Sequence, residues 1–199
     1  MLVNLDSSRR TFLTKGGTLL MGGLSTSTLL TASSSDEDIL LLHEVKVTQE
    51  MGVSTYKSLW DNLSGITEKE FDWRPNTESN SVRWVLGHLW WFEEWLGDAL
   101  EKKGRYFTDK TGTSIQDQPV TEIKIRFDSA RERVISLINK LTPEQLRSEI
   151  NYVGWFDIQI RKVLQTHVLH MSGHRYQIRY IRGTFSRVFH TNKADFDPW

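Results

Sequence analysis

Residues 157–182, DIQIRKVLQTHVLHMSGHRYQIRYIR, decide the fold class of this chain. Apolar residues recur in this stretch every three to four positions, which is the period of an amphipathic α-helix. The positions that carry the apolar stripe are Ile160, Val163, Ile178 and Ile181. Asp157 is a residue type that caps helix starts, and Gly183 follows the last apolar position. The pattern therefore predicts a long helix that buries one face.

The same period recurs in three earlier parts of the chain, so the sequence offers four long helices. They are expected over 38–62, 81–99, 120–141 and 157–182, with short helical turns near 67–70 and 142–145. No segment alternates apolar and polar residues between hairpin turns, so the sequence contains no clear pattern for the strands of a sheet. We therefore predict an all-α domain over residues 36–199, an antiparallel up-and-down four-helix bundle of the kind that builds metal sites between its helices.

Composition narrows the function. The 199 residues include 25 basic and 25 acidic side chains, so the formal net charge is zero. This balance gives no basic surface for nucleic acid. Cysteine is absent, which excludes disulfides, thiolate metal sites, iron–sulfur clusters and cysteine nucleophiles. Any metal ion must then be held by His, Asp or Glu. The eight tryptophans gather mainly between residues 60 and 95, which favours core packing over a ligand-stacking platform.

The N-terminal residues 1–35 are expected to be an export signal rather than part of the fold. The pair Arg9-Arg10, followed by Phe12-Leu13, resembles a twin-arginine signal, and the uncharged stretch after it is too weakly apolar to span a bilayer. Small residues over 31–34 offer a cleavage site. We therefore expect export to the periplasm or beyond, with no stable membrane insertion after signal removal. A tail with two chance arginines is the alternative.

Three histidines share one face of the predicted last helix. At about 100° per residue, His170 is about 60° from His167 and about 40° from His174. This face is also the apolar one. His88 lies on the apolar stripe of the helix expected over 81–99. A buried imidazole needs partners for both ring nitrogens, and one divalent metal ion satisfies several imidazoles at once. The spacing favours a metal site, and hydrogen-bonded core histidines are the alternative.

Other charged side chains near these histidines are not expected to bind metal. His43 and His190 lie outside the cluster and are expected at the surface. Glu93 is about 140° around its helix from His88, so Glu93 and Glu94 should both face away from the metal. A basic edge on the last helix is expected to be solvated or to form salt bridges. It consists of Arg175, Arg179 and Arg182.

Three motifs resemble a known family. Residues 73–81 (WRPNTESNS), 84–89 (WVLGHL) and 170–177 (HMSGHRYQ) are similar to the DinB-like (YfiT-like) superfamily of four-helix bundles. The shared pattern is a proline loop, a capped helix with one histidine, and a last helix with His-x-x-x-His followed three residues later by Gln. The resemblance covers essentially the whole chain after the signal. Met171 stands where the family often has an acidic residue, so no general base is implied beside the metal.

The resemblance implies a metal triad of His88, His170 and His174. It also implies one divalent ion, most often nickel or zinc, with coordination positions open to water or substrate. Gln177 matches a family glutamine that would support a ligand histidine without touching the ion. His167 matches a frequent family position and is expected to be a neighbour of the site.

These expectations lead to a metal-dependent enzyme as the predicted function. Three neutral ligands leave most of the ion's charge uncompensated and positions free, as in catalytic rather than structural sites. Hydrolysis by metal-activated water is the first hypothesis. A metal-dependent S-transferase that uses a low-molecular-weight thiol is an alternative, as is a non-catalytic metal-binding or sensing bundle. We expect a small-molecule substrate, and a homodimer is one assembly that the sequence allows.

Overall fold

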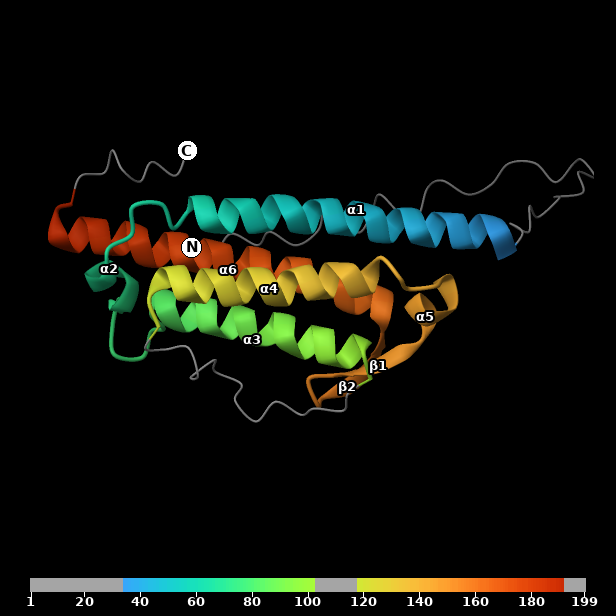
Figure 1. Ribbon diagram of the computed structural model, residues 1–199. Helices are drawn as coiled ribbons and strands as arrows, with labels where there is room; N and C mark the ends of the chain where they lie inside the picture. Colours follow the sequence, from blue (N-terminus) through green and yellow to red (C-terminus); the bar gives the residue numbers. More distant parts are fainter. Residues whose placement is uncertain (1–33, 103–117, 192–199) are drawn as a thin grey trace, which may run out of the picture. The chain divides into compact units, whose positions relative to one another are not determined.

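The computed structural model describes residues 34–102 and 118–191, and four long helices lie side by side in it (Figure 1). They are α1 (Ser34–Asp61), α3 (Val82–Leu100), α4 (Val120–Ile138) and α6 (Ile160–Phe189). The shorter elements are helices α2 (Glu68–Asp72) and α5 (Pro143–Arg147) and strands β1 (Glu149–Tyr152) and β2 (Phe156–Gln159). The predicted helical class is confirmed. The expected signal motif, Arg9-Arg10, lies outside the described residues.

Side-chain caps begin three of the helices where the sequence places cap residues. Ser81 Oγ accepts from the Trp84 backbone N–H at 3.2 Å at the start of α3. Thr67 caps α2 in the same way. Thr142 and Gln145 form a reciprocal capping box before α5. Such caps satisfy backbone N–H groups that have no partner within the helix, and each contributes about 1 kcal/mol.

The direction of the helices differs from the up-and-down order that the sequence predicts. Bonds between α1 and α6 join Glu44 to Arg161 and Ser58 to Arg175, and both pairs are 117 positions apart. A constant separation means that two helices run parallel. Bonds between α3 and α4 likewise join residues 32–39 positions apart, so this pair is parallel too. The colours in Figure 1 show the same directions.

The length of the connection permits this arrangement. The 19 residues of α3 make a helix about 28 Å long. The connection over residues 101–119 is long enough for the chain to return along that length before α4 begins. A short connection would have forced α4 to run antiparallel to α3. Antiparallel packing is instead found between α3 and α6, the two helices that carry the histidine cluster.

A short β-hairpin precedes α6, where the sequence predicts irregular chain. Strands β1 and β2 pair antiparallel, and Asp157 pairs with Asn151 within them. Asp157 is therefore not the expected helix cap, and α6 begins three residues later at Ile160. The turn contains two residues with positive φ, Val153 at 48° and Gly154 at 83°. Valine is disfavoured at positive φ, so the turn lacks the Asn-Gly signature of a recognisable hairpin.

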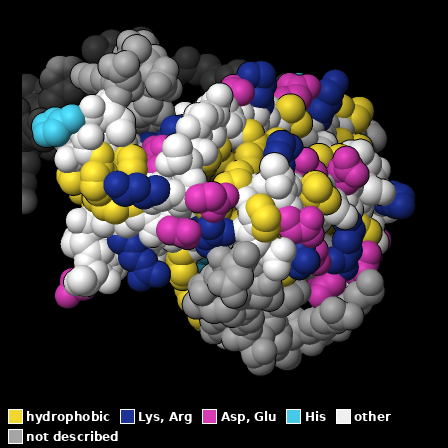
Figure 2. All heavy atoms as spheres, turned by 60° about the vertical axis from the view of Figure 1, so that its left-hand side comes forward, with side chains coloured by type: hydrophobic (Ala, Val, Ile, Leu, Met, Phe, Trp, Pro, Cys, Tyr) yellow, Lys and Arg dark blue, Asp and Glu magenta, His cyan; other side chains and the backbone are white. Residues whose placement is uncertain are grey.

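The apolar stripes of the long helices form two clusters along the bundle. One contains Phe71, Phe127 and Met171, and the other contains Trp95, Leu96 and Val163. Trp91 and Trp95 are buried, in line with the packing role expected for the tryptophans. On the face shown in Figure 2, basic and acidic side chains are interspersed rather than gathered into a patch of one sign. The described residues include no helix long and apolar enough to cross a membrane.

Candidate metal centre

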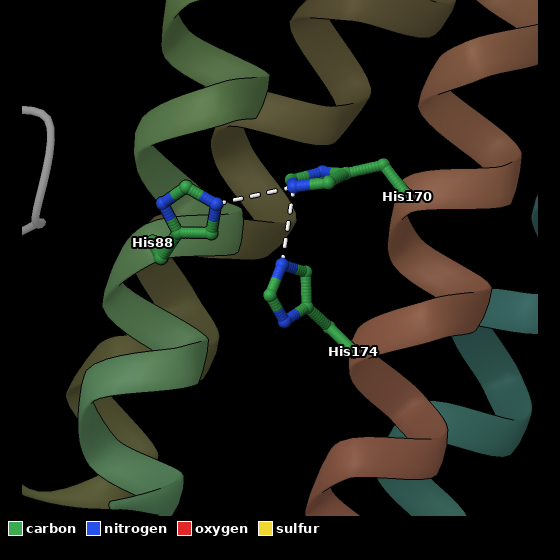
Figure 3. Close-up of side chains that lie close together, drawn as sticks. All are labelled: His88, His170 and His174. Atoms are coloured by element: carbon green, nitrogen blue, oxygen red, sulfur yellow. Dashed lines mark hydrogen bonds between the residues drawn. The ribbon is translucent and has the colours of Figure 1, made fainter. Parts of the chain in front are cut away.

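The histidine cluster forms where α3 and α6 pack antiparallel. His88 comes from α3, and His170 and His174 come from successive turns of α6 (Figure 3). The three rings point toward one another between the two helices. His170 Nε2 lies 3.1 Å from His88 Nε2 and 3.1 Å from His174 Nε2. The structure thus brings together the three residues that the sequence predicts as metal ligands.

The donor set fits one divalent metal ion. Two imidazole nitrogens at about 2.0–2.1 Å from the same ion stand about 3.0–3.4 Å apart, depending on the bond angle. The distances from His170 to the other two rings are in this range, and all three ligand atoms lie within 4.8 Å of one another. Among the described residues, no second group of three or more His, Asp or Glu side chains has such spacing. The group contains no carboxylate.

The surroundings keep two of the imidazoles neutral. Burial, reinforced by the neighbouring His174, His88 and His167, lowers the pKa of His170 to about 3. Burial also lowers the pKa of His174, although its hydrogen bond to Gln177 opposes this shift. A neutral imidazole keeps a lone pair for a metal ion, whereas a protonated one does not. At neutral pH the cluster is therefore ready to bind a cation.

Gln177 orients one of the ligand rings. Its Oε1 accepts a hydrogen bond from His174 Nδ1 at 2.8 Å. With the proton held on Nδ1, the lone pair of His174 is on Nε2, which faces the other two rings. This contact matches the role that the family resemblance implies for Gln177. His170 Nδ1 is buried and has no hydrogen-bond partner among the described residues.

Aromatic rings hold the cluster in place. Trp84 and Trp91 both stack on His88, with ring centroids 5.1 Å and 6.1 Å away and nearly parallel planes. Phe92 packs against His170 at 4.6 Å. These contacts restrict the rotation of the rings and exclude water from their sides. All three histidines remain partly exposed, so the point on which they converge stays accessible.

His167 is a neighbour of the cluster but belongs to a different group. Its Nε2 lies 3.0 Å from Glu93 Oε1, and the same oxygen accepts from Arg131 Nη1 at 3.3 Å. Phe92 stacks on His167 at 5.3 Å with an interplanar angle of 8°, and the other contacts of Phe92 include His170. We call Glu93, His167 and Arg131 the charged trio. All three members are buried.

The sequence analysis missed the charged trio, although it places Glu93 away from the metal. Burial by itself raises the pKa of Glu93, but the charges and hydrogen bonds of His167 and Arg131 outweigh it and hold that pKa below its ordinary value. One signal could have revealed the group. Glu93 and Arg131 both interrupt apolar stripes, since Arg131 follows Phe127 by four residues and precedes Val134 by three.

The other candidates lie apart from the cluster. His43 and His190 are exposed, and Glu94 binds Arg133 of α4 at 3.2 Å. The predicted basic edge of α6 is not uniformly solvated. Arg182 is buried and its Nε donates to Glu70 at 2.6 Å. Of the two expectations for this edge, solvation or salt bridges, Arg182 therefore follows the second.

Comparison with known families agrees with this geometry. A sequence profile of the DinB superfamily matches residues 53–178, which is more than half of the chain. The chain therefore belongs to the DinB superfamily, a superfamily of metal-binding proteins. The matched region contains His88, His170, His174 and Gln177. No curated protein sequence matches the chain significantly.

Proposed function

We propose that this protein is a divalent-metal-dependent hydrolase whose ion is held by His88, His170 and His174. The observation that carries the proposal is the convergence of three imidazole nitrogens at a partly exposed point. Because the group contains no carboxylate, the charge of a bound cation stays uncompensated by its ligands. Bound there, a divalent cation polarises a substrate oxygen and lowers the pKa of water, which is the chemistry of metal-assisted hydrolysis.

In this proposed function the protein's own residues hold the ion, orient the ligand rings and shield those rings. Gln177 fixes the proton of His174 on Nδ1, and burial keeps His170 unprotonated. Trp84 and Trp91 stack on the His88 ring. A substrate that reaches the open side of the cluster therefore meets aromatic walls. The described residues place no acidic side chain within the cluster, so a bound cation would keep its positive charge toward the substrate.

Metal analysis of the full-length protein is the first test. We expect one equivalent of nickel or zinc to bind, and the His170→Ala variant to lose it. His43→Ala is the matched control, since His43 is exposed and outside the cluster. A protein that takes up no divalent metal under any loading condition would overturn the proposal.

A substrate screen separates the hydrolase from its alternatives. Metal-loaded protein should cleave at least one ester, amide or phosphoester of a broad panel, and His170→Ala should not. Transfer of a low-molecular-weight thiol to an electrophile, without hydrolysis, would replace the proposal by an S-transferase. Metal binding without turnover in either screen would leave a metal-binding or sensing protein.

We further propose that the protein is exported through its N-terminal residues. The supporting observation is the sequence pair Arg9-Arg10 followed by an uncharged stretch. Replacing both arginines by lysine should retain a reporter fusion in the cytoplasm. Unchanged export of that double variant would contradict the proposal.

A further inference from the structure

A second cleft opens between α1, α4 and α6. Its volume is about 270 Å³, and its lining residues include His167 but none of the three cluster histidines. Polar side chains such as Thr48, Gln49 and Asn139 also line the cleft, but the walls expose mainly apolar surface. They include Val53 from α1, Val134, Ile135 and Ile138 from α4, and Leu164 and Val168 from α6. Such a cleft is near the lower end of the volumes typical of small-molecule sites.

Arg131 lies in the wall of this cleft and has N–H donors that make no hydrogen bond within the described part of the chain. It is 8% exposed. Its Nη1 donates to Glu93, and its guanidinium stacks over the Tyr56 ring at 4.6 Å. Asp128, one turn earlier on α4, also interacts electrostatically with Arg131, but the structure shows no second hydrogen bond for the guanidinium among the residues it describes. A guanidinium has five N–H donors, so most of those on Arg131 are unused.

Gly52 leaves the guanidinium open to the cleft. It is a buried residue in the middle of α1. A Cβ atom there would lie 3.5 Å from Arg131 Nη2 and 3.4 Å from Val168 Cγ2. Glycine weakens a helix interior by about 1 kcal/mol relative to alanine. The missing side chain at this point is what exposes Nη2.

We propose that this cleft binds a small aliphatic carboxylate, with its carboxylate on Arg131 and its chain along the α4 and α6 walls. Charge-assisted bonds from a guanidinium to a carboxylate are strong where water is excluded. Besides Arg131 and His167, the titratable side chains that line the cleft are Lys46 and Glu50, which are exposed and of opposite sign. Behind the wall, Glu93 binds Arg131 through one nitrogen only.

The volume sets the length of the ligand. A cleft of about 270 Å³ lies just below the roughly 300–1,000 Å³ typical of ligand pockets, so it suits a short ligand. Hexanoate is short and supplies both the charge and the aliphatic chain. It is therefore the probe for the experiment.

The experiment is a titration of the full-length protein with hexanoate, followed by calorimetry or by ligand-observed NMR. We expect saturable binding with a dissociation constant of about 1 mM or below. Gly52→Leu should weaken it at least tenfold, because the new side chain occupies the cleft beside Arg131 Nη2. Because a leucine at this buried position also packs against Val168, circular dichroism checks the fold of this variant, and Gly52→Ala, whose Cβ makes only ordinary contacts, should weaken binding in the same direction but less. Gly173→Leu is the matched control on α6, where a Cβ atom meets nothing within 4 Å.

Two further arms identify what is recognised and where. Hexan-1-ol lacks the charge and should bind at least tenfold more weakly than hexanoate. The His174→Ala variant should bind hexanoate as the parent does, because His174 does not line the cleft. Equal binding of the alcohol would overturn the carboxylate assignment. Loss of binding in His174→Ala, with retention in Gly52→Leu, would place the carboxylate at the histidine cluster and overturn the cleft site.

Discussion

The histidine cluster and the charged trio use the same residue type on the same helix and do opposite things with it. His170 faces His88 of α3, whereas His167, three residues earlier on α6, faces Glu93 of α3. The cluster is partly exposed and contains two imidazoles whose pKa burial lowers, whereas the trio pairs a buried carboxylate with a buried guanidinium. The comparison shows that the partner across the helix interface, rather than the histidine itself, decides between a metal site and a structural ion pair.

Phe92 lies where the two groups meet. It stacks on His167 and packs against His170. An aromatic ring between an ionic group and a neutral one limits direct hydrogen bonding between them. His167 contributes to the lowered pKa of His170, so the two groups are coupled electrostatically although each has its own hydrogen-bond partners, and the following predictions test how far they are separate.

The largest expected effect is on stability, through Glu93→Leu. This change leaves Arg131 and His167 buried without their carboxylate, and breaking a buried ion pair in this way costs about 3–5 kcal/mol. Urea unfolding followed by circular dichroism measures the loss. Metal content of the folded protein should not change.

Glu94→Leu is the control for that variant. Glu94 is the next residue on α3, is partly exposed, and binds Arg133 instead. Its loss should cost about 1 kcal/mol or less. If both variants lost the same free energy of unfolding, burial of the trio would not be the reason that Glu93 stabilises the fold.

The next effect is on metal binding. His170→Ala should lower metal affinity by more than the 10–100-fold that is typical of a lost outer partner. His167→Phe should keep the metal and lose stability instead, because only the trio is broken. Metal analysis and urea unfolding of both variants give the result. Loss of metal in both would unite the two groups into one site.

A smaller effect is expected from Gln177→Leu. Without the Gln177 oxygen, His174 is no longer held in the tautomer that presents Nε2, and metal affinity should fall by about 10–100-fold. Competition with a chelator of known affinity measures it. Gln165→Leu is the control, since Gln165 is exposed on α6 and bonds to Glu44 of α1. An unchanged affinity in Gln177→Leu would remove the orienting role.

The smallest expected effect, taken per pH unit, is the loss of stability of the metal-free protein as pH falls. The pKa of His170 is about 3 in the folded state and 6.5 ordinarily. Between these values the unfolded state holds the proton and the folded state does not, so stability falls as pH falls from 6.5 towards 3. The slope is at most about 1.4 kcal/mol per pH unit. His170→Ala should flatten this range in urea unfolding.

Glu93 also makes the folded protein less stable as pH falls, but in a lower pH range than His170. Its folded pKa lies below the ordinary 4.5, so its contribution is present above 4.5 and is lost as pH falls further. Glu93→Leu should remove only this lower loss. A pH profile in which Glu93→Leu flattens the range above 4.5 as well would show that the two groups titrate together.

Local periodicity made most of the fold predictable. The four long helices, the cap at Ser81 and the capping box at Thr142 all depend on residues within one or two turns of each other. The hairpin before α6 escaped prediction because Val153 at positive φ carries no turn signature. The parallel direction of α3 and α4 also escaped it, because chain length alone permits either direction.

The candidate site was predictable to a similar extent and for the same reason. His170 and His174 are four residues apart, and helix geometry places them on one face wherever the helix lies. Gln177 follows His174 by three residues and contacts it through the same geometry. Glu93 and His167 are 74 positions apart, and no local rule relates them.

The sequence by itself determined that the protein is helical, that any metal ligands must be nitrogen or oxygen atoms, and that three histidines share a face of the last helix. Only the tertiary structure decided which of the three faces His88 and which faces Glu93. The physical reason is that rotation within a helix follows from its fixed period, whereas the offset between α3 and α6 follows from how their side chains pack. A shift of one turn along that interface would have paired different residues.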